Sequence, residues 1–166
     1  MFRFRTRQTR GRPLSEKSKA RAAPPSLTRR SVLPQLRNHA PAFRDACDAF
    51  VSDWVREGDL PLYILMSDLV RHCSQLLADR DISELRAILA LVERWIGDGD
   101  DDLRTLAIVG FIEDATNANL HGHTTPDDLV PYLPPRCREA WDQVLRHWDE
   151  AILREEAARK ARQKKR

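Results

Sequence analysis

Residues 60–73, LPLYILMSDLVRHC, are the most hydrophobic run of the chain and set the pattern from which the fold is predicted. The large apolar residues of this run and its continuation recur at intervals of three, four and seven: Leu62, Leu65, Met66, Leu69, Cys73, Leu76 and Leu77. At about 100° per residue they cover roughly 120° of a helix surface. The run therefore predicts an amphipathic helix with one buried face, and Asp68 and His72 lie together just beyond one edge of it.

The same spacing on both sides of this run predicts a compact all-α bundle of about five or six helices. The other apolar segments are 43–54, 85–96, 103–112, a short segment ending near Leu133, and 137–152. Residues 103–112 are apolar almost all round, which places this helix at the centre of the bundle and leaves a buried strand as the alternative. Gly110 within it would permit a close helix crossing.

Polar residues and glycines mark the ends of the helix over 85–96. Asp81 and Glu84 have the spacing of a capping box, in which each side chain accepts a free backbone N–H at the start of the helix. Gly97 and Gly99 are expected to stop the same helix.

The charges divide the chain into three parts. Residues 1–30 carry ten Lys or Arg and one Glu, and residues 157–166 carry six Lys or Arg and no acid. Because the whole chain has a formal net charge of +3, residues 31–156 carry −12. We therefore expect a disordered basic tail over 1–30, a helical domain over 31–156 and a basic C-terminal tail over 157–166.

The basic tails are candidate contacts for a polyanion, and plain solvated extensions are the alternative interpretation. The candidate residues are Arg3, Arg5, Arg7, Arg10, Arg12, Arg29, Arg30, Lys164, Lys165 and Arg166.

Sequence signals for other classes of protein are weak. No apolar stretch approaches the ~20 residues of a membrane span, and the N-terminus has no apolar core of a secretory signal. A mitochondrial transit peptide fits the charge of residues 1–30, but their prolines oppose a long amphipathic helix. The three cysteines, Cys47, Cys73 and Cys137, are an odd number, which fits a reducing compartment, and we expect a cytoplasmic protein. No C-x-x-C, P-loop or G-x-G-x-x-G pattern occurs, so we expect no cofactor.

Three segments together resemble a known family. They are residues 60–73, the helix over 85–96 and residues 103–114, with the core patterns LMSDL at 65–69 and VGFIE at 109–113. They are similar to a bacterial family of small all-helical proteins that carry a domain of unknown function. The resemblance covers roughly residues 45–150. It implies an all-helical fold and a bacterial source, and it implies no activity.

Two groups of residues are candidates for chemistry. Asp68, His72 and Glu113 could serve a hydrolase if they shared a pocket, although no recognisable nucleophile accompanies them. The structural interpretation is that Asp68 pairs with His72 or with an arginine of a neighbouring helix, and that Glu113 is a buried hydrogen-bond acceptor. The loop with His121 and His123, close to the acids at 127–128, is the best metal candidate, with an ordinary loop as the favoured alternative.

The four tryptophans, Trp54, Trp95, Trp141 and Trp148, fit helix faces and are expected in the core or in an interface. We expect a non-enzymatic bacterial interaction or regulatory protein with a protein partner. An immunity- or antitoxin-like role is compatible, because an acidic body can neutralise a basic partner. The alternatives are a nucleic-acid-associated protein that binds non-specifically through its tails and, more weakly, the hydrolase.

Overall fold

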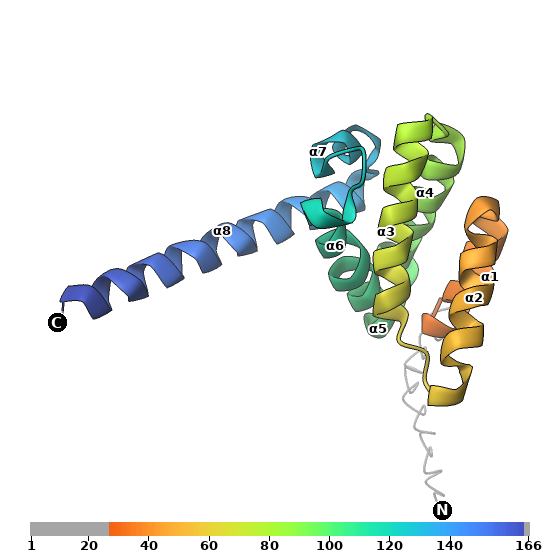
Figure 1. Ribbon diagram of the computed structural model, residues 1–166, viewed down its shortest axis with the longest axis horizontal. Coiled ribbons are helices and arrows are strands. Elements are labelled where there is room, and N and C mark those ends of the chain that lie inside the picture. The colour runs from red at the N-terminus through yellow and green to blue at the C-terminus, as the bar shows by residue number, and fades with distance from the viewer. Residues whose placement is uncertain (1–26, 165–166) are drawn as a thin grey trace, which may run out of the picture.

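The computed structural model describes residues 27–164, and in this range every regular element is a helix (Figure 1). The α-helices are α1 (Val32–His39), α2 (Arg44–Trp54), α3 (Leu62–Asp79), α4 (Ile82–Asp98), α5 (Asp101–Thr105), α6 (Glu113–Ala115), α7 (Pro126–Leu129) and α8 (Pro135–Lys164). Shorter 3-10 turns are η1 (Arg29–Ser31), η2 (Pro41–Phe43), η3 (Val55–Glu57), η5 (Ala118–Leu120) and η6 (Val130–Tyr132), and η4 (Leu106–Ile112) is a π-helical segment. The all-α prediction is confirmed.

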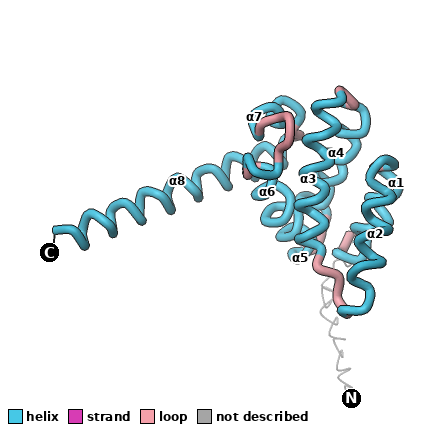
Figure 2. Tube along the Cα trace, viewed as in Figure 1, coloured by secondary structure: helices cyan, strands magenta, loops and turns pink. Residues whose placement is uncertain are grey.

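The number of helices is one more than the upper end of the prediction. Because η4 joins α5 to α6 without a break, residues 101–115 are a single helix and residues 27–164 form seven helices. The additional helix is α1, which ends at His39, just before Pro41. Figure 2 shows that short loops connect the helices at the ends of the body. In the same view α1 and α2 form one pair, α3 and α4 form a second, and α8 leaves the body.

The central contact of the body is the crossing of η4 over α3 at Gly110. A Cβ atom at Gly110 would lie 3.0 Å from Met66 Cγ and 3.1 Å from Tyr63 Cδ1, which is tighter than an ordinary van der Waals contact, so glycine permits the close approach of the two backbones. Leu106 and Phe111 of η4 are completely buried. The predicted central helix and the predicted close crossing at Gly110 are thereby confirmed, and the strand alternative is wrong.

Glu84 joins the first helix pair to the second. Its carboxylate accepts the backbone N–H of Ala42 at 3.1 Å and lies 3.2 Å from Nε2 of His72. Asp81 caps α4 as predicted, since its Oδ1 accepts the N–H of Glu84 at 3.2 Å. The reciprocal half of the predicted capping box is wrong, because the N–H of Asp81 donates to the carbonyl of Leu76 instead. Glu84 is thus free to connect helices that are distant in sequence.

The end of α4 differs from the prediction. Gly97 lies inside α4, where a Cβ would collide with the guanidinium of Arg136, and only Gly99 follows the helix as its C-cap. Gly97 therefore gives space to the first turn of α8 and does not stop α4. The loop after α4 also binds the start of the described chain, because the N–H of Asp100 donates to the carbonyl of Leu27 at 3.0 Å.

The two predicted tails are described only in part. Leu27 is buried and the turn η1 follows it, so residues 27–30 pack on the body although the charge pattern assigned them to the N-terminal tail. At the other end, α8 continues as a helix through Lys164. The candidate polyanion contacts from Arg3 to Arg12, together with Lys165 and Arg166, lie outside the described residues.

The Gly110 crossing generates the first prediction. Gly110→Val should lower the free energy of unfolding by about 1–3 kcal/mol, because a branched side chain has no room against Met66 and Tyr63. Urea unfolding followed by circular dichroism measures this. Val109→Ala, one position earlier and 46% exposed, is the matched control and should change little. An unaltered denaturation midpoint for Gly110→Val would contradict the close crossing.

Candidate interaction surface

The first turns of α8 are fixed to the body. Glu93 of α4 accepts the backbone N–H groups of Arg136 at 3.1 Å and of Cys137 at 2.9 Å, which satisfies donors that have no partner within the helix. Cys137 and Trp141 are buried on the same side of α8. These contacts set the direction in which the rest of the helix runs.

The outer part of α8 extends beyond the body (Figure 1). From Leu145 to Lys160 every residue except Ala151 is exposed. Three large apolar residues on this part, Leu145, Trp148 and Ile152, are 43%, 46% and 54% exposed. Their spacing of three and four residues places them along one side of the helix, and we call them the α8 stripe. Leu153, 64% exposed, lies next to it.

An acidic shelf borders the inner end of the α8 stripe. Glu113, Asp114, Thr116 and Asn117 line a cavity of about 490 Å³ together with Leu145 and Trp148, and we call these four polar residues the acidic shelf. The hydroxyl of Ser67 on α3 donates to the Asp114 carboxylate, which fixes Asp114 between α3 and α8. The surface therefore offers two carboxylates beside two partly exposed apolar side chains.

Charges along the outer part of α8 are separated into two blocks. Residues 149–156 contain four acids and one arginine, and residues 157–164 contain four basic residues and no acid. Within the acidic block, Arg154 pairs with Glu150 at 3.0 Å, one turn away on the same exposed helix surface. Such an exposed pair adds only about 0.3–0.5 kcal/mol. The charges therefore stabilise the outer helix weakly and are free to meet charges of another molecule.

The predicted hydrolase residues have separate partners. Asp68 is exposed and pairs with Arg71 of its own helix at 2.9 Å, whereas His72 lies against Glu84 and stacks on the ring of Phe43 at 5.1 Å between ring centroids. The predicted Asp68–His72 pair is therefore wrong, and so is the pairing of Asp68 with an arginine from another helix. Glu113 is half-buried in the acidic shelf and does not join either residue.

The histidine loop is held by hydrogen bonds to its own surroundings. Nε2 of His121 lies 2.9 Å from the carbonyl of Ala115, and Nδ1 lies 3.3 Å from the hydroxyl of Thr124. Asp128 accepts the N–H and the hydroxyl of Thr125, and these hydrogen bonds lower the pKa of its carboxyl. Among residues 27–164 no three His, Cys, Asp or Glu side chains are grouped as a metal site would require.

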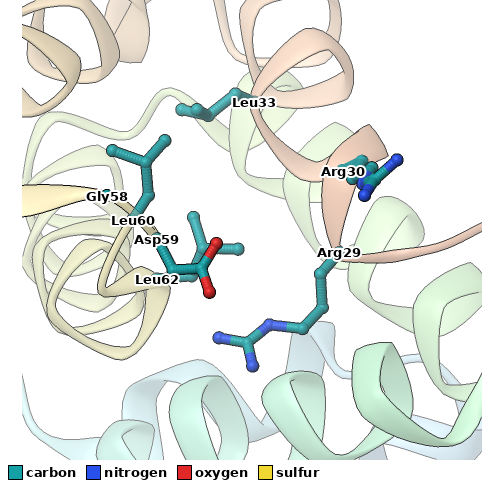
Figure 3. A pocket seen from close by; sticks show the side chains of 7 residues that line it. All are labelled: Arg29, Arg30, Leu33, Gly58, Asp59, Leu60 and Leu62. Carbon is teal, nitrogen blue, oxygen red and sulfur yellow. The ribbon is translucent and has the colours of Figure 1, made fainter. Parts of the chain in front are cut away.

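A second cavity, of about 460 Å³, lies between η1 and the loop before α3 (Figure 3). Figure 3 shows the Asp59 carboxylate and the Arg29 guanidinium pointing into the same space, with Leu33 and Leu60 on its wall. Arg29 also lies over the ring of Tyr63, 5.5 Å from its centroid. Of the two candidate polyanion contacts here, Arg29 is thus engaged by the body, and Arg30 is exposed.

The three cysteines do not provide a reactive thiol on either surface. Cys47, Cys73 and Cys137 are free and buried, and burial raises the pKa of each thiol. A thiol that stays protonated at neutral pH is a poor nucleophile.

A comparison with known families decides the relationship that the sequence pattern indicated. The profile of a family described as a domain of unknown function, DUF7674, matches residues 33–149. The chain belongs to the DUF7674 family. In this member the matched range contains the acidic shelf and two of the three stripe residues, and α8 continues beyond it. No curated protein and no solved structure matches the chain.

The structure distinguishes two tryptophans of this DUF7674 protein that were expected in the core or in an interface. Sequence periodicity gave Trp141 and Trp148 the same spacing on the last helix, and of these two the structure buries only Trp141. The length of α8 provides a signal for this difference, because α8 has 30 residues and its neighbours α3 and α4 have 18 and 17. Between residues 27 and 164 no helix has the length and apolar character that a bilayer span requires.

The difference between these two tryptophans can be measured directly. Trp141→Ala should lower the free energy of unfolding by about 3–5 kcal/mol, because it opens a cavity in the core. Trp148→Ala should lower it by about 1 kcal/mol or less, because this side chain is 46% exposed and lies at the edge of the body. Chemical unfolding at low protein concentration compares the two variants. Equal losses would show that Trp148 belongs to the core.

Proposed function

We propose that this DUF7674 protein is a non-enzymatic interaction module that binds a protein partner through the α8 stripe and the acidic shelf, in a bacterial cytoplasm. The observation that carries the proposal is the exposure of Leu145, Trp148 and Ile152 on a helix that extends past its own core. Contiguous apolar side chains rimmed by charges are typical of protein interaction sites. Tryptophan in particular is enriched among the residues that dominate binding energy.

The exposed apolar face of the outer part of α8 supports the same function. Most of the stability of a helix in a protein comes from packing of its apolar face rather than from intrinsic helix propensity. The part of α8 beyond Leu145 has such a face, but Trp148 is only half-covered at the edge of the body, and Ile152 and Leu153 are 54% and 64% exposed. A partner that covered the α8 stripe would therefore stabilise the helix and remove apolar surface from water at the same time.

The charges define the chemistry of the partner. Glu113 and Asp114 are half-buried beside the α8 stripe, so a partner that covers them must bring basic groups to avoid an unpaired buried charge. An immunity- or antitoxin-like role is one form of this function, in which the acidic body neutralises a basic toxic partner. This form predicts a partner protein that is toxic when it is expressed alone and harmless when it is expressed together with this chain.

Site-specific photo-crosslinking in the native host tests the proposed surface. A photoreactive phenylalanine at Trp148 should give a defined protein adduct, identified by mass spectrometry. The same group at Val55 is the matched control, because Val55 is 60% exposed on a different part of the body, and it should give no such adduct. Adducts at Val55 and not at Trp148 would place the interaction elsewhere. The absence of any adduct at Trp148 would overturn the proposal.

A second candidate function is non-specific binding of nucleic acid. The observation that favours it is the basic block of α8, where Arg159, Lys160 and Arg162 lie on a continuous helix and are exposed. Basic side chains in such a row can contact phosphates and displace counterions, which makes binding strongly dependent on salt. The basic residues of 1–26 would add to this effect.

The nucleic-acid candidate is tested by removing basic charge from α8 in the full chain. Changing the six basic residues of 159–166 to Gln should weaken binding to mixed-sequence DNA and RNA and reduce its salt dependence. Arg94→Gln, an exposed arginine of the body, is the control and should leave binding unchanged. Fluorescence anisotropy over a salt series measures both. Equal binding by all three proteins would exclude the basic block as the site.

A further inference from the structure

The described chain starts at the opposite end of the helix that carries the acidic shelf. The N–H of Asp100 donates to the carbonyl of Leu27, which fixes this start at the front of α5. The same continuous helix carries Glu113 near its other end, so at about 1.5 Å per residue Asp100 and Glu113 are ~20 Å apart. Residues 1–26 are therefore attached to the body within one helix length of the shelf.

The chain before Leu27 is long enough to reach both the acidic shelf and the α8 stripe. An extended chain spans roughly 3.4 Å per residue, so about six residues bridge ~20 Å. About 20 of residues 1–26 are then left to lie along the shelf and the outer part of α8. Leu145 and Ile152 are only ~10 Å apart along the helix. Reach therefore allows the first residues of the chain to cover the stripe.

The composition of residues 1–26 matches what this surface requires. These residues carry eight Lys or Arg and one Glu. Their first seven residues, MFRFRTR, alternate two phenylalanines with arginines. Aromatic rings pack against the ring of a tryptophan, and guanidinium groups bind carboxylates and stack on indole faces. The run at 1–7 thus combines the apolar groups that suit the α8 stripe with the cations that suit the acidic shelf.

The two carboxylates of the shelf have no cation in the described structure. Within residues 27–164 neither Glu113 nor Asp114 forms an ion pair, although both residues are half-buried. Asp114 accepts the hydroxyl of Ser67, which is a neutral donor. Attraction between opposite charges grows where water is partly excluded, so an arginine placed here gains more than one at a fully exposed acid.

The acids at the front of α5 lie nearer to Leu27 but suit the run at 1–7 less well. Asp101 there already pairs with Arg104 at 3.1 Å. The one large apolar residue of 98–105, Leu103, is buried, so this site offers nothing for the two phenylalanines to cover. The acidic shelf has exposed apolar side chains beside it and is therefore the better match.

We propose that residues 1–26 fold back on their own body and cover the α8 stripe and the acidic shelf in the free protein. The phenylalanines of the run at 1–7 pack against Trp148, and its arginines bind the shelf carboxylates. Because the segment is tethered to the same molecule, its effective concentration at the site reaches about the millimolar range. The consequence for regulation rests on the proposed function: a protein partner must displace residues 1–26 before it binds.

Crosslinking within the purified full-length chain tests the fold-back. A photoreactive phenylalanine in place of Phe4 should form an adduct with residues 113–117 or 145–152 of the same copy, identified by mass spectrometry. Mixing isotope-labelled and unlabelled protein separates the two kinds of adduct, because an adduct within one copy never joins the two labels. The yield should fall as salt is raised, since salt screens the attraction between exposed charges.

Variants of the surface test the site of docking. Glu113→Lys combined with Trp148→Glu should lower the yield of this adduct by about fivefold or more, because the first change repels arginine and the second removes the aromatic contact. Asp102→Lys combined with Val55→Glu is the matched control, since both positions are exposed outside the shelf and the stripe, and it should leave the yield unchanged. Thermal unfolding followed by circular dichroism verifies that each variant is folded.

A variant that leaves the body untouched gives an independent measurement. Changing the arginines of the run at 1–7 to Gln should lower the same yield by about threefold or more, because the shelf then loses its cations. Each of four results would overturn the fold-back: adducts only at residues 98–102, adducts only between labelled and unlabelled copies, no adduct at all, or a yield that neither set of variants reduces.

A measurement in the native host separates the fold-back from the proposed function. Phe2→Ser combined with Phe4→Ser should raise the yield of the host-protein adduct at Trp148 by about threefold or more, because residues 1–26 then compete less well. An unchanged yield would overturn the regulation. A host-protein adduct at Trp148 without any adduct inside the purified chain overturns the fold-back and leaves the proposed function standing. The reverse result, with no host-protein adduct even in this variant, overturns the proposed function and leaves the fold-back standing.

Discussion

The fold depends on the close approach of the η4 backbone to α3 at Gly110. Met66 and Tyr63 would lie about 3 Å from a Cβ atom there, so a side chain at this position would have to displace them for the central helix to keep its place against α3. η4 also packs against α4 and α8, so its place decides where the other helices can be. The π-helical hydrogen bonding of η4, in which Glu113 N–H reaches Ile108 C=O, coincides with this crossing. The helices of the body therefore pack around one buried central segment.

Periodicity predicted the helices well, because each buried face repeats every three to four residues. The face around Leu65 and Leu69, the capping carboxylate of Asp81 and the central position of residues 103–112 all follow from local pattern. Contacts between distant segments do not. Nothing near Glu84 in the sequence indicates that its carboxylate serves Ala42 and His72 rather than the start of its own helix.

The candidate surface shows the limit of the same reasoning. An apolar stripe predicts that one side of a helix is covered, but it does not say which molecule covers it. Trp141 and Trp148 have equivalent places in the pattern of α8, and only the extent of the body separates the buried one from the exposed one. The cavity beside the acidic shelf was also not visible in the sequence, because it combines Glu113 and Asp114 with residues of α8 about 30 positions later.

The attachment of α8 has a mechanical consequence. Glu93 and the buried Cys137 hold the first turn, and the free part beyond Leu145 is ~30 Å long, so the helix is a lever with a short anchored arm. A rotation of ~10° at the anchor would move the far end by ~5 Å, as follows from this length. Small rearrangements among α4, η4 and the base of α8 would therefore be amplified at the basic end of the chain.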